Sequence, residues 1–143
     1  MEQNNNIVPR NVELDETIYD TDKIKNLIYN IRGKQVMLDS DVAMLYHYET
    51  KNINLTVKRN NERFPENFCF RLTKDETEAL RLQIATASTI DEKKFRNKRY
   101  LPYAFTEQGI AMLSGLLKNE IAVQVSINIM NAFVEMRKFI VNN

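Results

Sequence analysis

Apolar and polar residues alternate with a period of two between residues 26 and 38, on both sides of Gly33. This alternation is typical of two short strands, each with one face toward a core. A Gly at the turn can adopt the backbone conformation that a tight hairpin requires. Residues 26–38 are therefore predicted to form a β-hairpin that turns near Gly33.

The apolar spacing becomes helical in the next segment. Asp39 or Ser40 can cap a first helix and Thr50 a second one, with a tight turn between the two. Pro65 is expected to end the second helix, because Pro lacks an amide and disfavours helical geometry at the preceding residue. Two short helices joined in this way are typical of a helix-turn-helix pair. The inner face of the second helix is expected to carry Ile53, Val57 and Phe64.

The second half of the chain predicts two more strands, each followed by a helix. Residues 68–72 alternate as a strand does, and TKDE at residues 73–76 matches a capping box at the start of a helix. Residues 99–105 predict another strand, and Pro102 predicts that this strand is an edge or bulged one. Thr106 can cap the helix that follows.

A last helix, expected over about residues 119–141, is apolar on two nearly opposite faces. One face can pack on the helix after Thr106 and on the sheet. The other face is covered either by the rest of the domain, as in a central helix, or by a second copy of the chain in a symmetric dimer. The candidate dimer interface consists of Val123, Ile127, Met130 and Val134.

These elements predict one α+β domain over residues 23–143, with a small antiparallel sheet, the helix-turn-helix-like pair and a long C-terminal helix. Residues 1–22 are rich in Asn and acids, and we expect them to form a flexible arm. Six acids against Arg10 give this arm a net charge of −5. The remaining residues carry +6, because the whole chain carries +1. A basic domain with an acidic leader indicates a polyanionic partner, although such charges also serve solubility.

The sequence contains one Cys, one His and three Gly. A single Cys excludes an intramolecular disulfide, and neither a long apolar run nor a signal peptide is evident, so we expect a cytoplasmic protein. His47 has no partner at metal-ligand spacing, and Cys69 is flanked by Phe residues. We find no catalytic constellation and no Gly-rich phosphate loop. The sequence therefore predicts neither an enzyme nor a bound metal or cofactor.

The segment VKRNNERFPENF, at residues 57–68, carries the polar side chains that read DNA. Asn can form two hydrogen bonds with adenine, Arg can do so with guanine, and both Lys and Arg neutralise phosphates. A helix that exposes these groups behind a tight turn can read the major groove. The alternative is a solvated helix face. The Asn residues count against it, because they lower helix propensity and add no charge.

A second basic segment, KKFRNKR at residues 93–99, precedes the strand predicted over residues 99–105. It can act as a wing that contacts phosphates or the minor groove, or it can be a surface loop. The candidate DNA-binding residues from the two segments are Lys51, Asn52, Asn54, Lys58, Arg59, Asn61, Arg63, Lys94, Arg96 and Lys98.

Three motifs resemble a known family: RGKQVMLDSD, VKRNNERFP and YLPYAFTEQG. They are similar to the KilA-N superfamily, in the branch named for the ORF-six N-terminal domain of phage and bacterial proteins, and the likeness covers about residues 27–137. The resemblance implies an α+β DNA-binding domain of phage or mobile-element origin, without cofactor or enzymatic activity. It also implies that the family's motif helix carries Lys58, Arg59, Asn60 and Arg63.

The chain departs from the family at His47, where Gly is usual, and in the long basic segment before the RYLPYAF strand. The resulting prediction is a sequence-specific double-stranded DNA-binding regulator. The alternative is an antirepressor-type protein-interaction module that binds a repressor and not DNA, and the acidic leader favours it.

Overall fold

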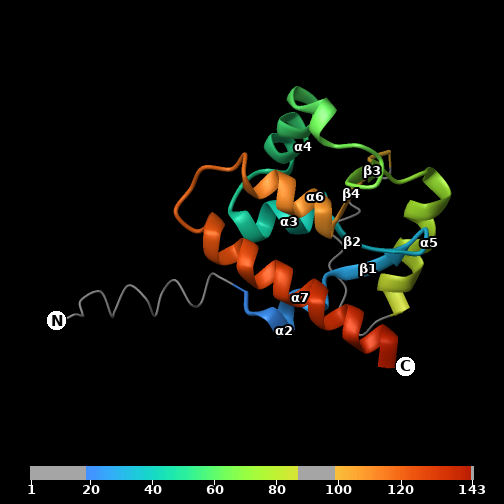
Figure 1. The fold of residues 1–143 in the computed structure, drawn as a ribbon. Coiled ribbons are helices and arrows are strands. Elements are labelled where there is room, and N and C mark those ends of the chain that lie inside the picture. Colours follow the sequence, from blue (N-terminus) through green and yellow to red (C-terminus); the bar gives the residue numbers. More distant parts are fainter. Residues whose placement is uncertain (1–18, 87–98, 143) are drawn as a thin grey trace.

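A four-stranded antiparallel sheet lies at the centre of the computed structural model, which describes residues 19–86 and 99–142 (Figure 1). The strand order is β1-β2-β4-β3, and the strands are β1 (Ile28–Ile31), β2 (Lys34–Leu38), β3 (Cys69–Arg71) and β4 (Tyr103–Thr106). The helices in the described residues are α2 (Thr21–Lys25), α3 (Asp39–Tyr46), α4 (Thr50–Arg59), α5 (Lys74–Thr86), α6 (Glu107–Ser114) and α7 (Ala122–Asn142), with a 3₁₀ turn η1 (Asn61–Arg63). The predicted α+β class with a C-terminal helix is confirmed.

The predicted hairpin forms between β1 and β2. Arg32 and Gly33 at its turn have φ angles of 58° and 72°, which is the pattern of a type I′ turn. A positive φ is unfavourable for Arg, but the Arg32 side chain is held in place by other contacts. Its Nε donates to Glu76 at 2.7 Å, and its guanidinium stacks over the ring of Phe70 at 4.2 Å. The turn is therefore fixed to the start of α5.

Both faces of the sheet are buried, because the strands carry apolar residues on both sides. One row across the sheet consists of Ile28, Met37, Phe105 and Cys69, which face a core shared with α3, α4, α6 and α7. A second row consists of Leu38, Ala104 and Phe70, which face a smaller core under α5. Figure 1 shows α5 at one end of the sheet, apart from the helices over the larger core.

The position of β4 corrects one expectation from the sequence. Pro102 predicts an edge or bulged strand, but β4 lies between β2 and β3 and pairs with both. Pro102 precedes the strand, so its missing amide does not interrupt either ladder. Its carbonyl oxygen accepts a hydrogen bond from the Leu72 amide at 2.9 Å.

Two of the predicted helix caps are confirmed. In α5, the Thr73 amide donates to the Glu76 carboxylate at 2.9 Å, and the Glu76 amide donates to Thr73 Oγ1 at 3.1 Å, which is the capping box. In α6, Thr106 Oγ1 accepts from the amide of Gly109 at 3.2 Å. Gly109 allows the close packing of α6, because a Cβ there would collide with the carbonyl oxygen of Phe68.

Two other predicted caps are wrong. The N-cap residues of α3 and α4 are Leu38 and Glu49, and neither provides a side-chain cap. Asp39 and Thr50 are instead the first helical residues. The reason for Asp39 is that its carboxylate is buried and bonded to other elements, as described below.

The helix α2 was not predicted, and it packs along α7. Its Ile24 is buried in the larger core, and Lys25 Nζ lies 3.4 Å from Glu135 Oε1 on α7. Because Thr21 and Asp22 belong to α2, the folded domain begins before residue 23, where the sequence analysis had placed its boundary. Residues 1–18, most of the predicted arm, lie outside the described residues.

Candidate nucleic-acid interface

A short turn at residues 47–49 reverses the chain between α3 and α4. His47 ends α3 in the left-handed conformation, with a φ of 62°. The amides of His47 and Tyr48 donate to the carbonyls of Met44 and Ala43, at 3.2 and 2.8 Å. This pattern satisfies the last carbonyls of α3 as a Gly-ended helix would. The tight turn predicted between two short helices is therefore present, and His takes the conformation in which Gly is usual.

The helix α4 has one buried and one exposed face. Ile53 and Val57 enter the larger core, as predicted. The exposed face consists of Lys51, Asn52, Leu55, Lys58 and Arg59. Leu55 was not among the residues predicted from the sequence. Its spacing could have revealed it, because a residue four after Lys51 and three before Lys58 shares their side of a helix.

The cations on this face are available to a partner. Within the described residues, the side chains of Lys58, Arg59 and Arg63 form no hydrogen bond or ion pair. Lys51 Nζ lies 3.8 Å from Glu49 Oε1, and both side chains are exposed, so this pair contributes little to stability. The protein therefore presents positive charges here that no neighbouring group among residues 19–86 and 99–142 neutralises strongly.

The end of α4 differs from the prediction. The helix ends at Arg59, well before Pro65, and Asn60 is its C-cap. Asn60 Nδ2 donates to the Thr56 carbonyl at 2.9 Å, so this side chain closes the helix and does not tie it to the sheet. Asn61 and Arg63 are exposed on η1 and do not continue the helix.

A buried carboxylate anchors α4 from behind. Asp39, the first residue of α3, is fully buried. Its Oδ2 accepts from Asn54 Nδ2 on α4 at 3.0 Å and from the Tyr103 amide of β4 at 3.1 Å. The Tyr100 hydroxyl also donates to Asp39 Oδ2 and accepts from Asn54 Nδ2 at 2.9 Å. One carboxylate therefore joins α3, α4 and the segment that leads into β4.

This network changes the role of Asn54. Its amide nitrogen makes two hydrogen bonds inside the protein, and its side chain is half-buried. The amide nitrogen of Asn54 is therefore engaged within the fold and is not available to read a base. Burial, together with the bond to Asp39, raises the pKa of Tyr100 above its usual range, so the hydroxyl stays protonated and can donate.

The second basic segment cannot be placed. Lys94, Arg96 and Lys98 lie outside the described residues, which resume at Arg99. The chain re-enters the described fold at the anchor of α4, because Tyr100 binds Asn54. This contact joins the end of the basic segment to the helix that carries the other candidate residues.

The described residues give little support to other chemistry. Cys69 is buried, and burial raises the pKa of its thiol to about 12, which keeps it protonated and unreactive. No group of three His, Cys, Asp or Glu side chains in the described chain could hold a metal ion. No helix in these ranges is long and apolar enough to cross a membrane.

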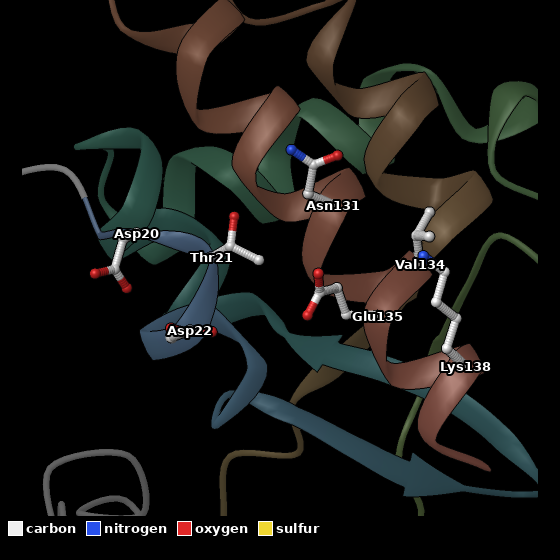
Figure 2. Close-up of a pocket in the computed structure, with 7 residues that line it drawn as sticks. All are labelled: Asp20, Thr21, Asp22, Asn131, Val134, Glu135 and Lys138. Atoms are coloured by element: carbon white, nitrogen blue, oxygen red, sulfur yellow. The ribbon is translucent and has the colours of Figure 1, made fainter. Parts of the chain in front are cut away.

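An open groove of about 430 Å³ lies between α2 and α7, as Figure 2 shows. Its walls carry three carboxylates and one ammonium group, and the lining residues are Asp20, Thr21, Asp22, Asn131, Val134, Glu135 and Lys138. Lys25 pairs with two of these, at 3.2 Å from Asp22 and 3.4 Å from Glu135. This groove is acidic where α4 is basic, so it does not extend the candidate interface.

A family model described as the ORF6N domain matches residues 26–116. The chain belongs to the ORF6N family. The ORF6N match includes the whole sheet, the pair α3 and α4, and α6, whereas α2 and α7 lie outside it. Membership of the broader KilA-N superfamily stays a prediction. No curated protein and no solved structure matches the chain.

Proposed function

We propose that this ORF6N protein is a sequence-specific double-stranded DNA-binding regulator of phage or mobile-element origin, which acts in the cytoplasm. The ORF6N match suggests a phage-type protein. The observation that most supports DNA binding is the exposed face of α4, where Lys58 and Arg59 have no partner within the described residues. A cationic helix behind a tight turn has the shape and charge to enter the major groove.

The side chains on this surface divide into two roles. Lys51, Lys58 and Arg63 neutralise phosphates, because they are exposed and positively charged. Asn52 and Arg59 point from the same helix and can form bidentate hydrogen bonds with base edges. Leu55, exposed between Lys51 and Lys58, offers an apolar contact to a thymine methyl group. Asn61 contacts the DNA backbone from η1.

The anchor at Asp39 supports this function through rigidity. Asn54 and Asp39 hold α4 against α3 on the side away from solvent. A helix that is already fixed loses less conformational entropy when it binds than a loop does. The same bond explains why Asn54 serves the fold, whereas Asn52, Lys58 and Arg59 on the exposed face serve DNA in this proposal.

Titration of the protein with labelled duplexes, at several salt concentrations, tests the proposal. Binding to a random duplex should weaken steeply with salt, with a log–log slope of about −3 if Lys51, Lys58 and Arg63 each release counterions. A duplex selected from a random library should bind more tightly than the random one. Absence of salt-dependent binding at low ionic strength would contradict the proposal.

A second candidate function is the antirepressor-type module that binds a repressor protein. The acid-rich residues 1–22 and the acidic groove between α2 and α7 favour it. A pull-down with phage and host repressors, run beside the duplex titration, distinguishes the two. We also propose that the chain is not an enzyme. A nuclease assay with divalent metal checks this point, and DNA cleavage would contradict it.

A further inference from the structure

The exposed apolar side chains of the described residues are unevenly distributed. The large ones are Met44, Leu55, Leu82, Val123 and Ile127. Met44, Leu55 and Leu82 each lie on a different helix, whereas Val123 and Ile127 are four residues apart on α7 and are 72% and 48% exposed. Single exposed apolar residues are common on protein surfaces, but an aligned pair indicates a contact surface.

The pair belongs to a longer row on α7. Val123, Ile127, Met130 and Val134 follow one another at spacings of four, three and four residues, the repeat of a coiled-coil seam. The opposite face of α7 carries Val125, Ile129 and Phe133, and these side chains are buried in the core of the same chain. The row is most exposed at Val123. Toward its other end it lies closer to the domain, because Met130 packs against the core and Val134 is half-buried.

We propose that this row packs in antiparallel orientation against the same row of a second copy of the chain, around a two-fold axis. The spacing of the row reads the same in both directions about a point between Ile127 and Met130. In antiparallel pairing, Val123 therefore lies opposite Val134 of the second copy, and Ile127 lies opposite its Met130. A two-fold contact uses one surface twice, and this row is complementary to itself in that way.

The charges at the two ends of the row favour this orientation. Glu120 is exposed in the turn just before α7, three residues before Val123, and Arg137 lies on α7 three residues after Val134 with its side chain 53% exposed. Antiparallel pairing brings Glu120 of each copy to Arg137 of the other, whereas parallel pairing brings like charges together. Arg137 already bonds Glu107 in its own chain, but a guanidinium has five N–H donors and can serve both carboxylates.

The dimer does not depend on DNA binding. The row lies on α7, after the end of the ORF6N match and on a different helix from the cationic face of α4. If both proposals hold, the dimer presents two α4 helices to a two-fold symmetric site.

Sedimentation of the protein over a range of concentrations tests the dimer. The wild type should be dimeric by about 100 µM, a concentration at which micromolar interfaces are occupied. Val123→Glu with Ile127→Glu should give a monomer with an unchanged circular dichroism spectrum. Leu82→Glu is the matched control, because it places the same charge at a 60% exposed apolar site on α5 and should leave the dimer intact. A monomeric wild type, or a double variant that still dimerises, overturns the proposal.

Cysteine trapping tests the orientation, and it decides the question if the double Glu variant fails to fold. Val123→Cys with Val134→Cys should form a covalent dimer on oxidation. Val123→Cys alone should not, because in antiparallel helices the two copies of residue 123 are separated by about 16 Å along the axis. The wild type, which keeps its buried Cys69, is the background control. A cross-link from the single variant, or none from the double variant, overturns the antiparallel dimer.

Discussion

The helices α4 and α7 bury apolar faces in the same core but expose different chemistry to solvent. On α4 the exposed face carries Lys51, Lys58 and Arg59 with one central Leu. On α7 the exposed face carries a row of apolar side chains that begins at Val123. The buried faces explain why both helices pack on the larger core. Only the exposed faces differ, so they indicate the partners: a polyanion for α4 and another apolar helix for α7.

The two helices are also fixed by different contacts. Besides the burial of Ile53 and Val57, the position of α4 depends on the hydrogen bond that Asn54 donates to the buried Asp39. The position of α7 depends mainly on apolar burial along Val125, Ile129 and Phe133. Its polar contacts lie along the edges of this face and include the 2.6 Å contact between the hydroxyls of Tyr46 and Ser126. Polar anchoring is more easily lost through one substitution, because every remaining donor is left unpaired in a dry site.

The largest expected effect is the loss of the α4 anchor. Asp39→Ala removes the acceptor of Asn54, Tyr100 and the Tyr103 amide, and should lower the free energy of unfolding by about 4 kcal/mol. Urea unfolding measures this change. Asp75→Ala, at an exposed site on α5, is the control and should change stability by less than about 0.5 kcal/mol. Equal effects of the two variants would show that the network does not hold the fold.

The two faces of α7 should respond differently to the same truncation. Ile129→Ala opens a cavity in the core and should cost about 3 kcal/mol. Ile127→Ala removes the same atoms from a half-exposed site and should cost about 0.5 kcal/mol in the monomer. Unfolding at low protein concentration, where any dimer has dissociated, compares the two variants. A large loss for Ile127→Ala under these conditions would mean that the second face is covered within its own chain.

The ion pair between Arg32 and Glu76, at the start of α5, provides a test that involves neither α4 nor α7. The hydrogen bond from Arg32 lowers the pKa of Glu76 from 4.5 to about 2, and the Thr73 amide adds to this effect. A lowered pKa means that the carboxylate favours the folded state at pH above about 4.5, and that this contribution disappears as the pH falls toward 2.

Melting curves between pH 7 and pH 2 test this linkage with Glu76→Gln. At neutral pH the free energy of unfolding of the wild type should exceed that of the variant by about 1 kcal/mol, because solvent screening weakens the ion pair. The two free energies should converge near pH 2. Asp75→Asn is the neighbouring control and should follow the wild type. A gap between wild type and Glu76→Gln that does not change with pH would contradict the assignment.

The turn before α4 should give the smallest effect. His47 has a φ of 62°, which Gly adopts without steric cost and a β-branched residue adopts poorly. His47→Gly should stabilise the protein by about 0.5 kcal/mol, and His47→Val should destabilise it by about 1 kcal/mol. The order of the three melting temperatures measures this, and a Val variant as stable as the Gly variant would contradict it.

Local patterns predicted most of the fold. The hairpin around Gly33, the capping box at Thr73, the cap at Thr106 and the buried face of α7 all depend on residues close together in sequence, and all are confirmed. The errors arise where contacts between residues far apart in sequence determine the local structure. Asp39 matches a helix cap locally, but it is drawn into the core by Asn54 and Tyr100. Pro102 predicts an edge strand, but it lies just outside the ladder.

The candidate site was predicted in part for the same reason. Helical spacing correctly placed Lys58 and Arg59 on the side opposite Ile53. It could not show that Asn54 bonds a carboxylate fifteen positions earlier, because that contact depends on how α3 packs on α4. The 3₁₀ turn at Asn61–Arg63 was also missed, since Pro65 suggested a later end to the helix.

DNA affinity after removal of the α4 charges tests the central claim most directly. Lys58→Ala with Arg59→Ala should weaken binding to a duplex at least tenfold and leave stability within about 1 kcal/mol. The salt slope should fall by about 1, because Lys58 contacts a phosphate while Arg59 reads a base. Lys74→Ala with Lys138→Ala removes the same charge from exposed sites on α5 and α7, and should leave the affinity close to that of the wild type. Equal losses in the two double variants would mean that binding follows net charge alone, and would contradict the assignment of DNA binding to α4.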